Sequence, residues 1–204
     1  MHDDTTPIAE TLERLERAEH LKLKGKYSEA LEILEQLLIE DPENISALEE
    51  VADNELNLEQ YDRAEVAAKQ TIVLDDESYT GHYILGFLRS VSSDWEKAAE
   101  HLRKANASRP NNAEILRCLG WALFNMGQKA QGIVTLERAL NLDNENAFTL
   151  CDLGVTYLQT RNFPKAKALF ERALNLDPTN PKAIECIHAM GKLEEAMKKG
   201  KQAA

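Results

Sequence analysis

The sequence predicts an all-α fold, a solenoid built from antiparallel helix pairs. The first observation behind this prediction is a repeat: Leu-Gly occurs at 85–86, 119–120 and 153–154, each time 34 residues after the last. The second is composition. Only 9 glycines and 6 prolines stand among 204 residues, while Ala, Leu, Glu and Lys abound, which favours helix throughout. A fixed period of this length is typical of a repeat architecture.

The 34-residue frame extends back to Thr11 without insertion or deletion. It predicts a single domain of five repeats, preceded by a lead-in and followed by a closing helix and a tail. The lead-in covers 1–10, the repeats cover 11–44, 45–78, 79–112, 113–146 and 147–180, the closing helix covers 181–200 and the tail 201–204. Each repeat has room for two helices of about 14 residues, roughly 21 Å long.

Two positions in every repeat carry small side chains, which suit helices pressed together with their backbones close. The eighth residue is Ala18, Ala52, Gly86, Gly120 or Gly154, and the twentieth is Ala30, Ala64, Ala98, Gly132 or Ala166. Glycine or polar residues near the middle of each repeat, such as Gly25 and Gly127, predict the turn between the two helices. Pro164 fits the first turn of a second helix, where a missing N–H costs nothing.

The fifth repeat carries a characteristic set of residues. It contains Leu150, Leu153, Gly154, Tyr157, Ala166, Phe170, Ala173 and Pro178. In these residues and their spacing the sequence resembles the tetratricopeptide repeat family, over residues 11–180. The resemblance implies a right-handed superhelical solenoid. Two repeats depart from the pattern at their eleventh residue, which is Glu55 in the second and Arg89 in the third. We expect these two side chains to face each other as a partly buried pair.

The two ends of the chain are expected to cover the exposed faces of a solenoid. Thr6 and Pro7 suit the cap and first turn of a lengthened opening helix. After the fifth repeat, apolar residues recur at steps of three and four beside charged ones, which predicts an amphipathic closing helix. Its apolar residues are Ala183, Ile184, Ile187, Met190, Leu193 and Met197.

Charge is unevenly distributed along the chain. The net charge is −11, yet residues 1–78 carry 22 acidic against 7 basic side chains, whereas residues 79–204 carry 13 against 17. The acidic half argues against nucleic acid as a ligand, because phosphate binding needs the opposite sign. It favours basic partners. The alternative is that this half simply has a well-solvated acidic surface.

The sequence also bears on location. No apolar run approaches the ~20 residues needed to span a bilayer, and the acidic start at 1–4 is unlike a secretory signal. We therefore expect a cytoplasmic protein that does not contact a membrane. The three cysteines, Cys118, Cys151 and Cys186, are then expected to be reduced, with Cys118 and Cys151 near each other as packed thiols.

Signatures of catalysis and of cofactor binding are missing from the sequence. It has no Gly-rich phosphate loop, no Gly-x-Ser-x-Gly and no His-Glu-x-x-His. None of its five histidines pairs with a cysteine at a zinc-ligand spacing. We therefore expect no enzymatic activity, no cofactor and no metal.

The family resemblance implies a concave groove lined by the first helix of each repeat. An acidic entrance to it is predicted at Glu16, Glu19, Glu49, Glu50 and Asp53. The peptide-binding part is predicted at Tyr83, Ile84, Phe87, Arg117, Trp121, Phe124, Asn125, Phe148, Asp152 and Val155. Exposed aromatic clusters often mark interaction sites. The alternative is that some of these apolar side chains belong to the core.

These observations favour a non-catalytic scaffold or adaptor for protein–protein interaction. It would bind a peptide or helical segment that has apolar anchors and a basic flank. A second hypothesis is a self-assembling structural scaffold, in which the acidic N-terminal part meets the weakly basic C-terminal part of another copy. The expected partner is thus a protein or peptide, and under the second hypothesis a homo-oligomer forms.

Overall fold

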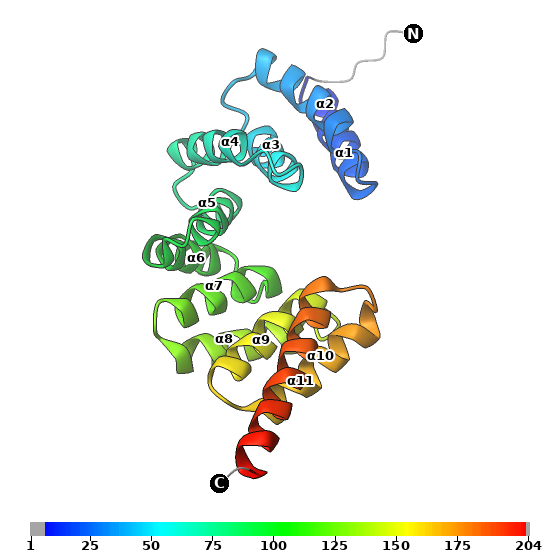
Figure 1. Cartoon of the computed structure of the whole chain (residues 1–204). Helices are drawn as coiled ribbons and strands as arrows, with labels where there is room; N and C mark the ends of the chain where they lie inside the picture. Colours follow the sequence, from blue (N-terminus) through cyan, green and yellow to red (C-terminus); the bar gives the residue numbers. More distant parts are fainter. Residues whose placement is uncertain (1–6, 203–204) are drawn as a thin grey trace. The chain divides into compact units, whose positions relative to one another are not determined.

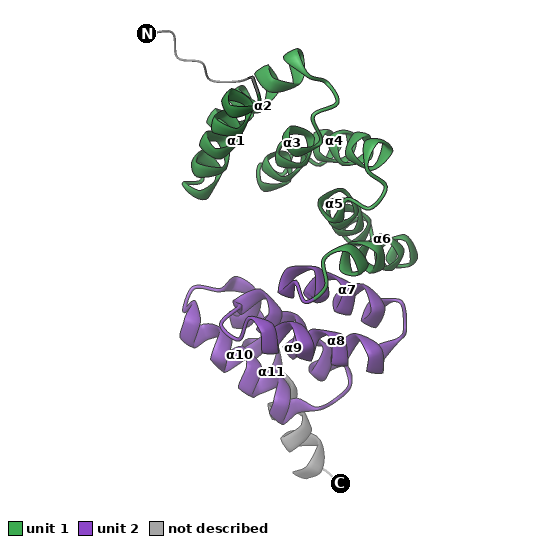
Figure 2. Ribbon diagram, turned by 180° about the vertical axis from the view of Figure 1, so that it is seen from behind, with its two compact units in different colours: residues 1–110 green, residues 111–204 purple. Residues whose placement is uncertain are grey.

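The computed structural model describes residues 7–202, with side-chain burial described for residues 8–192. Over residues 7–202 the chain forms eleven α-helices and no strand. Contacts divide the chain into two compact units, residues 1–110 (unit 1) and residues 111–204 (unit 2) (Figure 2). The predicted all-α class is confirmed. The single domain over residues 11–180 stays a prediction.

Unit 1 contains three helix pairs, one in each of the first three predicted repeats. The two helices of a pair pack against each other, as α3 and α4 do (Figure 1). The helices are α1 (Pro7–Leu23), α2 (Tyr27–Glu40), α3 (Ile45–Asn57), α4 (Tyr61–Leu74), α5 (Tyr79–Val91) and α6 (Trp95–Ser108). Thr6, the predicted cap of α1, lies outside the described residues.

Unit 2 contains two further helix pairs and a final helix. Pro164 stands in the first turn of α10, as predicted. The final helix packs against the preceding pair. The helices are α7 (Ala113–Asn125), α8 (Lys129–Leu142), α9 (Ala147–Gln159), α10 (Phe163–Leu176) and α11 (Pro181–Gln202).

The first helix of every repeat ends just before a residue with left-handed backbone. This is always the fifteenth residue: Gly25, Glu59, Ser93, Gly127 and Arg161, with φ between 59° and 95°. Glycine adopts this conformation freely, whereas each of the other three residues costs roughly 1 kcal/mol. The turns predicted near the middle of the repeats are therefore confirmed, including those in which no glycine stands.

The last residue of every repeat caps the helix that follows. Asn44, Ser78, Asn112, Asn146 and Asn180 each accept a hydrogen bond from the backbone N–H three residues on, at 2.9–3.0 Å. Such a cap contributes about 1 kcal/mol. Because both cap and turn recur at fixed positions, every first helix ends at the same place in the frame, and from the second repeat on each also begins at the same place.

The small residues of the eighth and twentieth positions lie where paired helices touch, as predicted. Ala30 and Ala64 are both 0% exposed. At Gly132 of α8 the contact is with backbone, because a Cβ there would lie 2.6 Å from the backbone nitrogen of Phe124 and 2.7 Å from the carbonyl oxygen of Gly120. Backbone meets backbone there, so only glycine fits without moving the helices apart.

Candidate functional site

Three neighbouring helices of unit 2, α7, α9 and α11, bring two aromatic rings and two cations together. Lys182 Nζ on α11 lies 4.9 Å from the centroid of the Trp121 ring on α7. Arg117 Cζ on α7 lies 5.9 Å from the centroid of the Phe148 ring on α9. Phe148 is 67% exposed, a large fraction for an aromatic side chain. We call Arg117, Trp121, Phe148 and Lys182 the aromatic surface.

Asp152 of α9 holds both cations in place. It is buried, and its Oδ2 accepts a hydrogen bond from Arg117 Nη1 at 2.7 Å while its Oδ1 accepts one from Lys182 Nζ at 2.6 Å. Glu114 accepts two more hydrogen bonds from Arg117. A buried carboxylate is tolerated when it is paired in this way. The charges of the two carboxylates thus balance those of the two cations, so the surroundings of the two aromatic rings carry no net charge.

The structure brings Arg117, Trp121, Phe148 and Asp152 together, four of the seven groove residues predicted in unit 2. Phe124 is different: it is only 2% exposed and belongs to the core, so its assignment to a binding groove is wrong. The other two are occupied locally. Asn125 Nδ2 donates to the carbonyl of Trp121 at 2.8 Å, and Val155 packs against a core cluster.

In unit 1 the predicted groove residues all contribute to packing. Ile84 is 0% exposed, which makes its assignment to the groove wrong as well. Tyr83 and Phe87 are half-buried against the same core cluster, with their ring centroids 6.5 Å apart. The alternative recognised from the sequence, that some of these residues are core, therefore holds for Ile84 and Phe124.

Part of the predicted acidic entrance already has partners within unit 1. Lys22 Nζ lies 2.8 Å from Glu50 Oε2 and 3.0 Å from Asp53 Oδ2, so one base serves two of the acids. Glu49 accepts a hydrogen bond from the Ser78 hydroxyl. Glu16 and Glu19 are exposed on α1. Of the five predicted acids, these last two are thus the most open to solvent.

The expected pairing of Glu55 with Arg89 is wrong. Arg89 Nη2 bonds to Glu65 instead. Glu55 is fully buried, and the base nearest to it is Arg63, whose Nη2 lies 2.8 Å from Glu55 Oε1. Both side chains occupy the same position of the repeat frame, but the frame does not determine which residue of a neighbouring helix each side chain contacts.

All three cysteines are free thiols, as expected. Burial raises the pKa of the Cys118 thiol, and it raises the pKa of Cys151 to about 11. Both are therefore protonated near neutral pH and poor nucleophiles. Cys118 Sγ lies 3.6 Å from Glu114 Oε1, and Cys151 Sγ lies 3.6 Å from Asn180 Oδ1.

Sequence reasoning missed Lys182. The predicted repeats end at residue 180, and the closing helix is predicted as a cap and not as part of the groove. Continuing the frame by one step puts Lys182 at the second position, the place that Glu114 and Phe148 hold in the fourth and fifth repeats. The repeat spacing, continued into the closing helix, therefore predicts that Lys182 lies on the same face as these two side chains.

Two further searches concern the described part of the chain. No helix in it combines the length and the apolar character needed to cross a membrane. Nor do three or more His, Cys, Asp or Glu side chains of that part gather in a way that could hold a metal ion.

Comparison with known proteins finds repeats of one family in residues 92–180. One tetratricopeptide repeat model matches residues 147–180, the fifth repeat as predicted, and a second matches residues 92–150. These two matches assign residues 92–180 to the tetratricopeptide repeat family. Members of this family generally mediate protein–protein interaction and are typically non-catalytic scaffolds.

Relatives of this tetratricopeptide repeat protein are distant. Human tetratricopeptide repeat protein 21B is 25% identical over 202 residues, which cover 92% of this chain. The chain spans only 15% of the length of that relative. Among solved structures, a thermophilic tetratricopeptide repeat protein of Thermus thermophilus has a TM-score of 0.69 at 21% identity, covering 90% of this chain and 99% of that one. YrrB has a TM-score of 0.62 at 20% identity, covering 86% and 90%. These likenesses confirm the all-α, tetratricopeptide-like fold.

Proposed function

We propose that this chain is a non-catalytic module that binds a segment of another protein through apolar anchors on the aromatic surface. The observation that carries the proposal is the exposed ring of Phe148, 67% accessible and close to the fixed side chain of Arg117. Aromatic side chains are favoured binding anchors because they bury a large area and lose little rotamer entropy. The solved structure of YrrB is described as a tetratricopeptide repeat protein with an unusual peptide-binding site, which supports a peptide as the ligand.

The electrostatics of the aromatic surface favour an apolar anchor over a strongly charged one. Arg117 and Lys182 are balanced by Asp152 and Glu114, so neither cation is in excess. Hydrogen bonds hold both cations beside the rings, which leaves the side chains pre-organised before a ligand arrives. Pre-organisation lowers the entropy that binding has to overcome.

A basic segment of the partner would bind to exposed acidic side chains of unit 1, in a contact separate from the aromatic surface. We assign this contact to Glu16 and Glu19, because Glu49, Glu50 and Asp53 already have partners. Attraction between exposed charges is screened by salt over roughly 10 Å at 0.1 M. The basic part of the ligand should therefore contribute a salt-dependent share of the affinity, and the apolar anchor a salt-independent share.

Selection of 12-residue peptides from a phage library on the full chain tests this proposal. We expect the selected peptides to carry an aromatic or aliphatic anchor, and Phe148→Ala to weaken their binding about tenfold or more, the usual cost of losing an anchor residue. The matched control is Val134→Ala, because Val134 is 64% exposed and stands on α8, a helix that contributes no residue to the aromatic surface. Equal affinities of the Phe148 and Val134 variants would contradict the proposal.

The basic flank is tested separately, by titration at low and high salt. The double variant Glu16→Gln/Glu19→Gln should flatten the salt dependence of the wild type. A variant with the same change in net charge, Glu43→Gln/Glu59→Gln, should retain it. If both double variants keep the salt dependence of the wild type, the basic flank does not bind to this part of unit 1.

A further inference from the structure

Glu55 is a buried carboxylate whose hydrogen-bonding capacity is not used. It lies on α3 at the eleventh position of the second repeat and is 0% exposed, and neither of its oxygens has a hydrogen-bond partner. Arg63 Nη2 approaches Oε1 to 2.8 Å, but this nitrogen donates its hydrogen bond to Glu35 Oε1 at 2.7 Å. Leaving a charged group so poorly paired in the interior is costly, so Glu55 calls for a functional explanation.

Two cavities meet at this carboxylate, between α2, α3 and α4. The first has a volume of about 350 Å³, and the second about 480 Å³. Both are lined by Glu55 and Arg63. Cavities of this size fall within the range of small-ligand sites, about 300–1,000 Å³. The first cavity is mainly apolar, with Leu38, Leu48, Val51, Val66 and Ala67 in its lining.

Acidic side chains predominate among the charged residues of the two linings. They are Glu32, Glu35, Glu55 and Asp62, against the single base Arg63. The Arg63 side chain is 60% exposed and pairs with both Glu35 and Glu55, so an incoming cation has to take its place beside Glu55 and balance that charge in turn. An incoming cation would find one buried carboxylate with unused acceptor sites, and further carboxylates near the opening.

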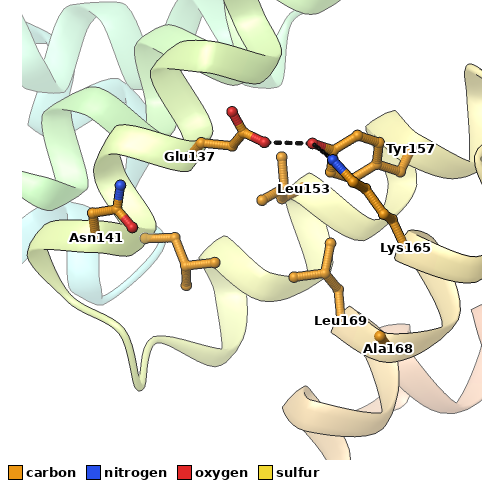
Figure 3. A pocket seen from close by; sticks show the side chains of 8 residues that line it. Glu137, Asn141, Leu153, Tyr157, Lys165, Ala168 and Leu169 are labelled. Carbon is orange, nitrogen blue, oxygen red and sulfur yellow. Dashed lines mark hydrogen bonds between the residues drawn. The ribbon is translucent and has the colours of Figure 1, made fainter.

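The corresponding place in unit 2 shows what a completed arrangement looks like. Three repeats later in the frame, Tyr157 replaces Glu55, Lys165 replaces Arg63 and Glu137 replaces Glu35, around a cavity of about 460 Å³ (Figure 3). The Tyr157 hydroxyl donates to Glu137 and accepts from Lys165 Nζ at 3.2 Å. Three of the polar side chains of that cavity, Glu137, Tyr157 and Lys165, are thus joined through the Tyr157 hydroxyl. In unit 1 the corresponding set leaves Glu55 without a hydrogen bond.

We propose that the Glu55 cavity is a binding site for an alkylguanidinium or alkylammonium group, which donates hydrogen bonds to the Glu55 carboxylate while its alkyl stem packs against Leu48, Val51 and Ala67. The apolar lining selects an organic cation, because a bare metal ion requires several oxygen ligands around it. The group is carried either by a basic side chain of a peptide or by a free amine. This inference is independent of the aromatic surface, which lies in unit 2.

The test uses n-butylguanidinium and n-butylammonium as probes, followed by NMR of the full chain. In the wild type, titration should shift the signals of Leu48, Val51 and Ala67. Glu55→Gln keeps the volume of the side chain and removes its charge, so binding should weaken about tenfold or more, in line with roughly 1.5–3 kcal/mol for a hydrogen bond to a charged group. Glu43→Gln makes the same change in net charge at an exposed site and should bind like the wild type.

A second variant guards against a loss of fold. Glu55→Tyr rebuilds the unit 2 arrangement with Glu35 and Arg63 as its partners, so the variant should stay folded and lose the probe. The peptide Ac-Gly-Arg-Gly-NH₂ and its citrulline counterpart separate the two ligand sources. Tighter binding of the arginine peptide than of n-butylguanidinium indicates a protein side chain as the ligand. Weaker binding of the arginine peptide indicates a free amine. Equal binding by the wild type and Glu55→Gln, or shifts confined to exposed acids, would overturn the proposal.

Discussion

Glu55 in unit 1 and Tyr157 in unit 2 stand at the same position of their repeats, in contact with a carboxylate and a base from equivalent places. Tyr157 fills the site with an aromatic ring and bonds to both neighbours. Glu55 is also buried, but it brings a charge and leaves its oxygens without hydrogen bonds. The backbone frame is the same in both repeats, so the difference lies in the side chains: Glu55 against Tyr157 at the eleventh position, and Arg63 against Lys165 beside it.

The comparison teaches that the frame and the chemistry of the repeat are specified separately. Caps, turns and small contact residues recur in every repeat and fix the helices. The eleventh position can then vary: Leu21, Glu55, Arg89, Leu123 and Tyr157 occupy it in turn. Stability alone would favour a well-paired or apolar side chain at this position. A buried side chain without hydrogen bonds there, such as Glu55, therefore indicates a candidate ligand site.

The largest expected effect comes from truncating the completed site. Tyr157→Ala should lower the free energy of unfolding by about 3–5 kcal/mol, because it removes a buried aromatic ring and leaves a cavity. Urea unfolding followed by Trp121 fluorescence, in a Trp95→Phe background, reports on unit 2. Glu55→Ala, followed by Trp95 in a Trp121→Phe background, should cost far less. Similar losses at the two sites would break the comparison.

Replacing Glu55 by an apolar residue is expected to raise the free energy of unfolding. Glu55→Leu introduces the residue that stands at this position in the first and fourth repeats, and it should raise the free energy of unfolding by about 2 kcal/mol, since replacing a poorly paired buried charge is often stabilising. Arg63 is exposed and keeps its ion pair with Glu35 at 2.7 Å, so it is not left uncompensated. Destabilisation in urea unfolding, followed by Trp95, would mean that Glu55 is better paired than its contacts indicate.

The next largest effect is expected in the pH dependence of the unfolding free energy, to which Glu55 contributes. Burial raises the pKa of Glu55 above its ordinary value of 4.5, against the opposing effect of Arg63. The folded state therefore holds the proton more tightly than the unfolded state. The stability contributed by this group is complete below pH 4.5 and is lost as pH rises through the folded pKa, by at most about 1.4 kcal/mol per pH unit.

The measurement is the difference in unfolding free energy between the wild type and Glu55→Gln, from pH 4 to pH 7. It should turn against the wild type as pH rises. His82 and His101 also titrate in unit 1, with pKa values lowered mainly by burial, but both are present in the two proteins and their effect cancels. Parallel curves would show that the carboxyl group of Glu55 does not change its pKa on folding.

Much of the fold could be predicted from the sequence because its causes recur. Position-specific features such as Gly132, Pro164 and the turn at Gly127 act over a few residues, and five copies of the frame reinforce one another. Burial was harder to predict. Phe124 and Ile84 have the composition of binding residues, but whether such a side chain faces solvent or a neighbouring helix depends on a rotation that the repeat period alone does not fix.

The candidate site shows the same limit for polar contacts. Arg117, Trp121, Phe148 and Asp152 were predicted as a set, because helices spaced by one repeat present equivalent positions on one face. Lys182 could have been found by extending the frame into α11. The true partners of Glu55 and Arg89 could not be found in this way, since Arg63 and Glu65 reach them from α4 by side-chain orientation and not by sequence spacing.

The smallest expected effect tests whether the hydroxyl of Tyr157 is what completes its site. Tyr157→Phe keeps the ring and removes the donor to Glu137, and Glu137 is partly open to water that can replace the lost bond. The free energy of unfolding, followed by Trp121, should fall by about 1 kcal/mol, the usual net contribution of one hydrogen bond. Tyr61→Phe, at a tyrosine of unit 1 that is 37% exposed, should change the free energy of unfolding followed by Trp95 by less than about 0.5 kcal/mol. If the two substitutions cost the same, the ring alone accounts for the difference between Tyr157 and Glu55, and the hydrogen bonds to Glu137 and Lys165 add nothing to the stability of unit 2.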